Sequence, residues 1–232
     1  MSKVQVDLLQ FQAKNNNRIR GELIRNFYTF DRNIAKAHYS SASAYFLSYM
    51  FSGVPAPKFQ HTITAARKGW MQLISYLLYG VDKLKDVDMN ILMNWTIDDA
   101  CQTLNLEKIV LKPEEYTTTY WGPRYWKFLH LTSFLVDGRQ EIIKMFASLM
   151  YIFNLLLICQ ICSLNYMKKQ PMLTVTIPMI ESSDPITTIF NLHNTVNIAT
   201  NKKEFSIEAF CNKYGAQIYA TEKITYDTNL IL

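Results

Sequence analysis

The sequence predicts an all-α protein. Hydrophobic residues make up 49% of the 232 residues and charged residues only 19%, so the chain can bury a substantial core. Glycine and proline occur seven times each, too rarely for a sandwich of short strands joined by many turns. Apolar and aromatic side chains recur at helical spacing through most of the chain, which favours a bundle of helices.

The charge pattern argues against a nucleic-acid-binding protein. The formal net charge is +5, and the 24 basic residues are scattered, as at Arg18, Arg20 and Arg25. A surface that follows a phosphate backbone needs those charges clustered in a stripe. The first seven residues contain no apolar segment of the kind found in a secretory signal, so we expect no secretion by that route.

Three helices are expected in the first half of the chain. The first covers residues 26–50, and the prolines within residues 53–57 end it because proline restricts its own φ and the conformation of the residue before it. The second covers residues 70–81, with Gly80 as its C-terminal cap. The third covers residues 88–106. This half carries no recognisable chemistry, so we expect a helical layer that buries a partner surface.

A polar, threonine-rich connector at residues 107–120 marks the domain boundary, which we place after residue 112. Pro123 in a first turn and Asp184 before a proline are both helix-start signals. The expected helices cover residues 122–136, 139–158, 162–169 and 184–199, with a short one inside 202–214 and a loop or extended segment at 172–185. The predicted regions are a helical region at 1–112, a second domain at 113–215 that carries the motifs described next, and a tail at 216–232.

Residues 145–166 contain no charged side chain, which raises the question of a membrane span. A span needs about 20 apolar residues, and this run is nearly that length. Asn154, Gln160, Asn165 and two cysteines interrupt it. A central bundle helix that is apolar nearly all round gives the same pattern. We expect such a buried helix, with a small membrane protein as an alternative.

Cys159 and Cys162 lie one helical turn apart, where two thiols can form a disulfide or react in sequence. The thiolate is the reactive form, and a helix N-terminus stabilises its charge. Zinc sites use the same spacing, but the remaining ligands would have to come from Cys101, Cys211 or the histidines, none of which forms a second CxxC pair. Alone, the pair is compatible with redox chemistry or with a metal.

Two further patterns place heterocyclic or amide side chains on shared helix faces. Trp126 and His130 are four residues apart, as are His193 and Asn197. Such faces offer ring surface and hydrogen-bonding groups that suit a planar heterocycle. For each pattern alone, a core tryptophan and structural histidines are the favoured interpretation.

In their order along the chain, these patterns resemble the Erv/ALR family of flavin-dependent sulfhydryl oxidases. The family pattern WGPxxWxxLHxxS, CxxC, HNxVNxxxxKxxF covers about residues 120–214 here. The matching residues are Trp121, Gly122, Pro123, Trp126, Leu129, His130, Ser133, Cys159, Cys162, His193, Asn194, Val196, Asn197, Lys202 and Phe205. With its long helical region in front, the chain looks most similar to the divergent enzymes of large insect DNA viruses, the baculovirus type. In those enzymes the first half is a degenerate copy of the catalytic fold, although residues 1–112 keep no motif of such a copy.

The resemblance implies a four-helix bundle with a short fifth helix that binds FAD and oxidises thiols in proteins. Cys159 would take the attack of the substrate thiol, and Cys162 would pass electrons to the flavin. Oxygen would then accept them, giving hydrogen peroxide. The residues expected to bind the cofactor are Gly122, Arg124, Trp126, His130, Tyr166, His193, Asn194, Val196, Asn197, Lys202 and Phe205, and no metal ligand is expected.

The resemblance also implies partners and a location. We expect thiol-containing protein substrates, in particular virion proteins, a homodimer, and a place in the virion and in the cytoplasm or nucleus of the infected cell. Phe190 and Ile207 stand where cellular members commonly have the two cysteines of a structural disulfide. The absence of that disulfide suits a reducing compartment or the viral branch. Cys101 and Cys211 match no shuttle pair and are expected to be buried free thiols. A zinc-stabilised helical adaptor that uses the CxxC pair is the other alternative.

Overall fold

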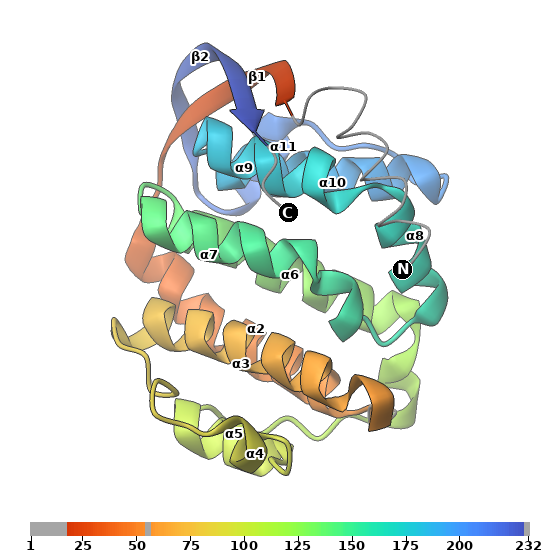
Figure 1. Cartoon of the computed structure of the whole chain (residues 1–232). Coiled ribbons are helices and arrows are strands. Elements are labelled where there is room, and N and C mark those ends of the chain that lie inside the picture. The colour runs from red at the N-terminus through yellow and green to blue at the C-terminus, as the bar shows by residue number, and fades with distance from the viewer. Residues whose placement is uncertain (1–17, 54–56, 230–232) are drawn as a thin grey trace.

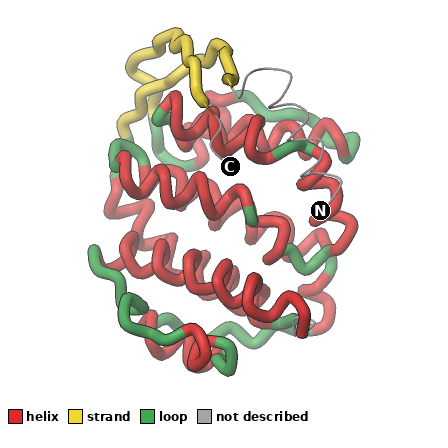
Figure 2. The backbone as a smooth tube through the Cα atoms, in the orientation of Figure 1, coloured by secondary structure: helices red, strands yellow, loops and turns green. Residues whose placement is uncertain are grey.

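The computed structural model describes residues 18–53 and 57–229, and most of these residues are helical (Figures 1 and 2). The predicted all-α class is therefore confirmed, with one small sheet added in the described part of the chain. The helices are α2 (Arg32–Phe51), α3 (Gln60–Tyr79), α4 (Met89–Leu92), α5 (Ile97–Leu104), α6 (Thr118–Val136), α7 (Gln140–Tyr151), α8 (Gln160–Lys168), α9 (Ile177–Ser182), α10 (Pro185–Ala199) and α11 (Ile207–Lys213). The strands are β1 (Arg18–Thr29) and β2 (Gln217–Asn229).

The helices lie in successive layers (Figure 1). One side of the layer formed by α6 and α7 packs against α2 and α3, and its other side packs against α9 and α10. The short helices α4 and α5 cover the outer side of α2 and α3, and α8 lies at one end of the layers. The β1–β2 ribbon contacts α9 and α11 at the opposite edge of the molecule from α4 and α5.

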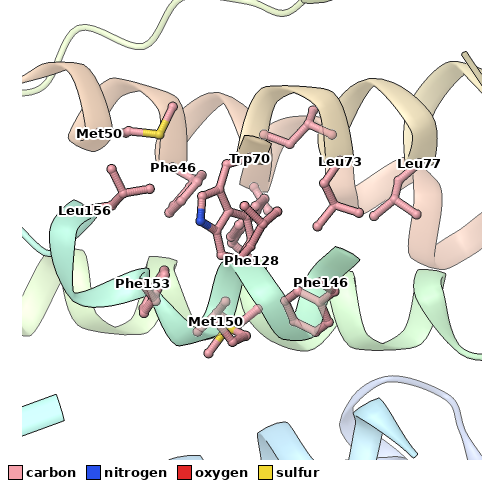
Figure 3. Packing of buried hydrophobic residues seen from close by; sticks show 14 of the residues in the cluster. Phe46, Met50, Trp70, Leu73, Leu77, Phe128, Phe146, Met150, Phe153 and Leu156 are labelled. Carbon is pink, nitrogen blue, oxygen red and sulfur yellow. The ribbon is translucent and has the colours of Figure 1, made fainter. Parts of the chain in front are cut away.

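One hydrophobic core joins residues on both sides of the predicted boundary after residue 112. Phe46 of α2 stacks on Phe128 of α6, with ring centroids 4.0 Å apart and planes 8° apart. Trp70 of α3 lies 5.6 Å from Phe128 and 5.9 Å from Phe146 of α7, measured between ring centroids (Figure 3). None of these four side chains is more than 1% exposed. The first half of the chain is thus part of the same packed interior as the second.

Local capping chemistry sets several helix ends as the sequence predicts. Gly80 adopts the left-handed conformation at φ 75° and ends α3, where its N–H donates to the Tyr76 carbonyl. A residue with a Cβ adopts this conformation only with strain, so glycine is the natural choice. Asp184 caps α10 by accepting a hydrogen bond from the Thr187 N–H at 2.8 Å. Both predictions are confirmed.

Other predicted helix boundaries in the first half were wrong. The helix expected from residue 26 begins only at Arg32, because Asp31 caps it by accepting hydrogen bonds from the backbone N–H groups of residues 33 and 34. The single helix expected at 88–106 is two helices, α4 and α5. Asp88 and Thr96 each cap a new N-terminus, so the backbone leaves the helical conformation between them.

The uncharged run at residues 145–166 is divided among three helical pieces. Helix α7 ends at Tyr151, a 3-10 turn covers Phe153–Leu156, and α8 begins at Gln160. Across the ranges that the structure describes, no helix is both long and apolar enough to cross a bilayer. The loop expected at 172–185 is also helical, with a π-helical turn at Met172–Thr176 followed by α9.

The region predicted as a tail forms strand β2, which pairs antiparallel with β1. Cross-strand ion pairs such as Arg20–Asp227 and Lys223–Glu22 lie on the exposed part of the ribbon. At its inner part, the N–H of Asn26 donates to the buried carboxylate of Asp184 at 2.7 Å. The same carboxylate that caps α10 therefore also attaches the ribbon to the helices.

Candidate functional site

Helices α6 and α10 bring together three of the predicted site residues. The rings of Trp126 and His193 stack face to face, with centroids 4.0 Å apart and planes 10° apart. The Nδ1 atom of His193 lies 3.1 Å from the Nε2 atom of His130, which is 3% exposed. The i, i+4 spacing of Trp126 and His130 on α6 makes this meeting with one residue of α10 possible. We call these three residues the ring stack.

The segment after α10 closes one side of the ring stack. Phe205 approaches His193 edge to face, with centroids 5.0 Å apart. The side-chain amide of Asn194 donates to the Phe205 carbonyl at 2.9 Å and accepts from the Phe205 N–H at 3.3 Å. Asn194 is itself buried, so it holds Phe205 in place by two hydrogen bonds from within the core. Asn197 acts similarly through its backbone carbonyl, which accepts from the Lys202 N–H at 2.8 Å.

The two imidazoles of the ring stack are neutral at neutral pH. Burial, with smaller contributions from His193 and Lys213, holds the pKa of His130 well below its ordinary value. Burial also lowers the pKa of His193 to about 4, and the charges of Lys213 and Lys202 act in the same direction. Neutral rings can stack on an uncharged heterocycle without the cost of desolvating an imidazolium.

One residue of this cluster was not predicted from the sequence. The hydroxyl of Tyr214 lies 2.9 Å from Nδ1 of His130, and the two rings meet edge to face. Tyr214 follows α11 directly, at the end of the segment that resembles the family pattern. The only signal in the sequence is its position fifteen residues after Ala199, which ends the helix of His193 and Asn197.

Cys159 and Cys162 form a disulfide at the start of α8, with Cα atoms 5.2 Å apart. Cys159 is the N-cap residue, and its Sγ accepts a hydrogen bond from the Cys162 N–H at 3.2 Å. Both cysteines are partly exposed and pack against the main core. The helix N-terminus next to them stabilises a thiolate in the reduced pair.

Three other predicted residues stand apart from the ring stack. Arg124 is two residues from Trp126 on α6, so about 200° of helical rotation separates them. Its guanidinium pairs with Glu115, donates to the Tyr49 hydroxyl at 2.8 Å and lies over the Tyr45 ring. Arg124 therefore connects α6 to the first half of the chain.

Tyr166 packs elsewhere in the core, and Gly122 lies beside open space. Tyr166 is buried, packs against Phe153 and donates to the Met150 carbonyl at 2.6 Å. A Cβ at Gly122 would meet no atom within 4 Å, so there is open space beside this residue. Val196 is half-buried on α10 and Lys202 is exposed in the segment after it.

The remaining cysteines agree with their prediction as buried free thiols. Cys101 and Cys211 are each 3% exposed and unpaired with another cysteine, and burial raises the pKa of the Cys211 thiol to about 11. Phe190 and Ile207 both pack in the smaller hydrophobic cluster near the ribbon. Within the described ranges, no three or more His, Cys, Asp or Glu side chains are grouped so as to hold a metal ion.

The helical fold and the cysteine pair at the start of α8 agree with the resemblance to the Erv-type sulfhydryl oxidases. Curated relatives from African swine fever virus carry the name FAD-linked sulfhydryl oxidase. The protein of a pig isolate from Kenya is 28% identical to this chain, and the protein of a warthog isolate from Namibia is 29% identical, each over 107 residues. The matched region is 44% of this chain and 86% of the relative. No family model and no solved structure matches the chain.

These relatives confirm the resemblance to viral Erv-type enzymes that the motifs predict. The more specific assignment to the baculovirus type stays a prediction. The roles of the individual site residues also stay predictions, now with a defined arrangement: a ring stack between α6 and α10, and a cysteine pair on α8.

Proposed function

We propose that this chain is a FAD-linked sulfhydryl oxidase that forms disulfide bonds in protein substrates. The observation that carries the proposal is the combination, in one helical bundle, of a neutral ring stack and a disulfide at a helix N-terminus. The ring stack offers binding surface for a planar cofactor, and the disulfide offers an oxidant for thiols. The viral relatives named FAD-linked sulfhydryl oxidase support the same assignment.

The residues present fit FAD by the chemistry of their donor set. Trp126 and His193 offer flat, uncharged rings for an adenine or an isoalloxazine. Asn197 is 9% exposed, and its side-chain amide has no hydrogen-bond partner among the residues that the structure describes. This amide is therefore free to hydrogen-bond a ligand. The exposed ammonium group of Lys202 suits a phosphate, and the space beside Gly122 leaves room for a close approach.

The cysteine pair performs thiol exchange in two steps. The substrate thiolate attacks Sγ of Cys159, so a mixed disulfide forms and Cys162 leaves as a thiolate. Cys162 is the third residue of α8, where the free N–H groups of the first turn stabilise that charge. A second substrate thiolate then displaces Cys159, which leaves an oxidised substrate and a reduced pair. FAD, when bound, supplies the two-electron acceptor that reoxidises the pair.

The surface beside the disulfide suits a protein substrate. Ile161 lies between the two cysteines in the sequence and is 70% exposed, and Leu164, one turn further along α8, is 57% exposed. A chain whose thiol reaches Cys159 would pass close to both. We therefore propose substrates with apolar side chains next to the reactive cysteine, with virion proteins as the main group.

We also propose oxygen as the final electron acceptor, with hydrogen peroxide as product, and a homodimer as the assembled form. The two sides of the α6–α7 layer are already covered by α2–α3 and α9–α10, so a dimer would use another surface. Stable obligate interfaces bury more than about 2,000 Å², which light scattering of the purified chain would test through its mass. The proposed location is the virion and the cytoplasm or nucleus of the infected cell.

A visible absorption spectrum followed by an oxygen-uptake assay tests the proposed function. The purified protein should show a flavin band that bleaches on addition of dithiothreitol without air, and should consume oxygen with dithiothreitol in air. A colourless protein that takes up no FAD would contradict the proposal. In that case, metal analysis would decide whether the cysteine pair belongs to a zinc-stabilised adaptor.

Replacing His193 by alanine should weaken FAD binding about tenfold. The variant loses the ring that we propose stacks on the cofactor, and an aromatic pair contributes about 0.5–1.5 kcal/mol. Since about 1.4 kcal/mol corresponds to a factor of ten, the dissociation constant should rise by about that factor. Flavin titration followed by fluorescence would measure it. His61→Ala, which changes an exposed histidine of α3, is the matched control, and equal affinities in the two variants would remove His193 from the site.

A further inference from the structure

Tyr214 contacts the ring stack at His130 and is held there by aromatic packing. Its ring packs against Phe134 and Phe210, with centroid distances of 5.3 and 5.2 Å. These contacts direct its hydroxyl to Nδ1 of His130, at 2.9 Å. The other nitrogen of His130 lies 3.1 Å from Nδ1 of His193. A single file of polar atoms therefore runs from the Tyr214 hydroxyl through both imidazoles.

Only two arrangements of protons satisfy this file when both histidines are neutral. A neutral imidazole carries one N–H, so each histidine donates from one nitrogen and accepts at the other. In the first arrangement, Tyr214 donates to His130, His130 donates to His193, and His193 keeps its proton on Nε2. In the second, every direction is reversed and His193 carries its proton on Nδ1.

The Tyr214 hydroxyl distinguishes the two arrangements. In the second one, its oxygen accepts a hydrogen bond from His130, and its own O–H needs another acceptor. Within the described part of the chain, Nδ1 of His130 is the only partner that the hydroxyl has. Burial raises the pKa of Tyr214 above its ordinary value, so the phenol keeps its proton. Tyr214 is partly buried, and the first arrangement pairs its O–H within the protein whereas the second leaves it without a protein acceptor, which favours the first arrangement.

We propose that Tyr214 is a positioning residue that acts through His130 to keep the proton of His193 on Nε2. The Nε2–H of His193, which has no partner among the described residues, then faces a ligand as a hydrogen-bond donor. This inference rests on the proposed function for the identity of the ligand. On FAD, the group that it fits is an acceptor, either a ring nitrogen or a phosphate oxygen.

The test is Tyr214→Phe, which keeps the ring and its packing and removes the hydroxyl. The full chain labelled with ¹⁵N-histidine contains four histidines, so the nitrogen signals of each can be assigned from single replacements. In the wild type, His130 and His193 should both show the pattern of a proton on Nε2. In Tyr214→Phe, Nδ1 of His130 has no partner in either arrangement, so both tautomers should appear.

FAD affinity provides the second readout. Tyr214→Phe should raise the dissociation constant of FAD about threefold to tenfold, because part of the population now presents an acceptor where the ligand needs a donor. Tyr219→Phe is the matched control, since it removes a hydroxyl from an exposed tyrosine of β2 and should change neither readout.

The two readouts separate the possible failures. A wild-type His193 with its proton on Nδ1, or the same single tautomer in the wild type and in Tyr214→Phe, would overturn the proposal. An altered tautomer with unchanged FAD affinity would overturn the part that concerns the ligand. A protein that shows the expected tautomers but binds no FAD would contradict the proposed function instead, and would leave the proton arrangement supported.

Discussion

Replacing Cys162 by serine is expected to reduce thiol oxidation to the background rate while FAD remains bound. Serine cannot form the disulfide with Cys159, so the protein loses the group that accepts electrons from a thiol. The residues proposed to hold the cofactor lie on α6, on α10 and in the segment after α10, whereas Cys162 lies on α8. Oxygen uptake with dithiothreitol and the absorbance of the flavin band would measure the two properties separately.

Cys159→Ser should behave in the same way, because both sulfurs are needed for the exchange. The matched control is Cys101→Ala, which removes a buried free thiol far from α8 in the sequence and should retain full activity. An active Cys162→Ser variant would show that the pair is not the redox centre. A Cys162→Ser variant that loses its flavin would show that α8 also contributes to the cofactor-binding site.

The meeting of Trp126, His130 and His193 could be anticipated because each position depends on local helical geometry. An i, i+4 pair on one helix shares a face whatever the tertiary structure is, and the caps at Gly80 and Asp184 depend only on neighbouring backbone. The spacing could not show that the face of α6 with Trp126 and His130 packs against the face of α10 with His193. That information came from the family resemblance, which ordered the three patterns along one chain.

The role of Arg124 in cofactor binding stays a prediction, and helical geometry sets this residue apart from Trp126. The family pattern places it between two site residues, but on a helix a residue two positions from Trp126 points to nearly the opposite side. The structure accordingly shows it paired with Glu115 and in contact with Tyr45 and Tyr49.

The ribbon and Tyr214 could not be predicted because both depend on contacts between distant residues. Strands β1 and β2 pair residues as far apart in the sequence as Arg20 and Asp227, and neither segment alternates strongly enough to indicate a strand alone. The chain has 14 tyrosines, and nothing local distinguishes Tyr214 from the others. Its hydroxyl matters only because folding brings it to His130, 84 residues earlier.

Replacing Trp70 by alanine is expected to destabilise the whole protein, by about 3–5 kcal/mol. Trp70 is fully buried on α3 and touches rings from α2, α6 and α7, so its removal leaves a cavity where the two halves meet. For a chain of this size, 1 kcal/mol corresponds to roughly 2–4 °C, so the melting temperature should fall by about 10 °C. Thermal unfolding followed by circular dichroism and by flavin release should give coincident transitions, because the two halves of the chain share one core.

Trp70→Phe separates the loss of ring packing from the loss of the indole N–H. That N–H is buried without a hydrogen-bond partner in the described structure, so removing it relieves an unfavourable group while most of the ring packing is kept. Trp70→Phe should therefore cost far less than Trp70→Ala. If Trp70→Ala lowered only one of two separate transitions and flavin stayed bound above it, the first half would be an independent domain. A single shifted transition would instead mean that the layer of α2 and α3 folds as one unit with α6 and α7. Without that layer, Phe128 and Phe146 would be exposed to water.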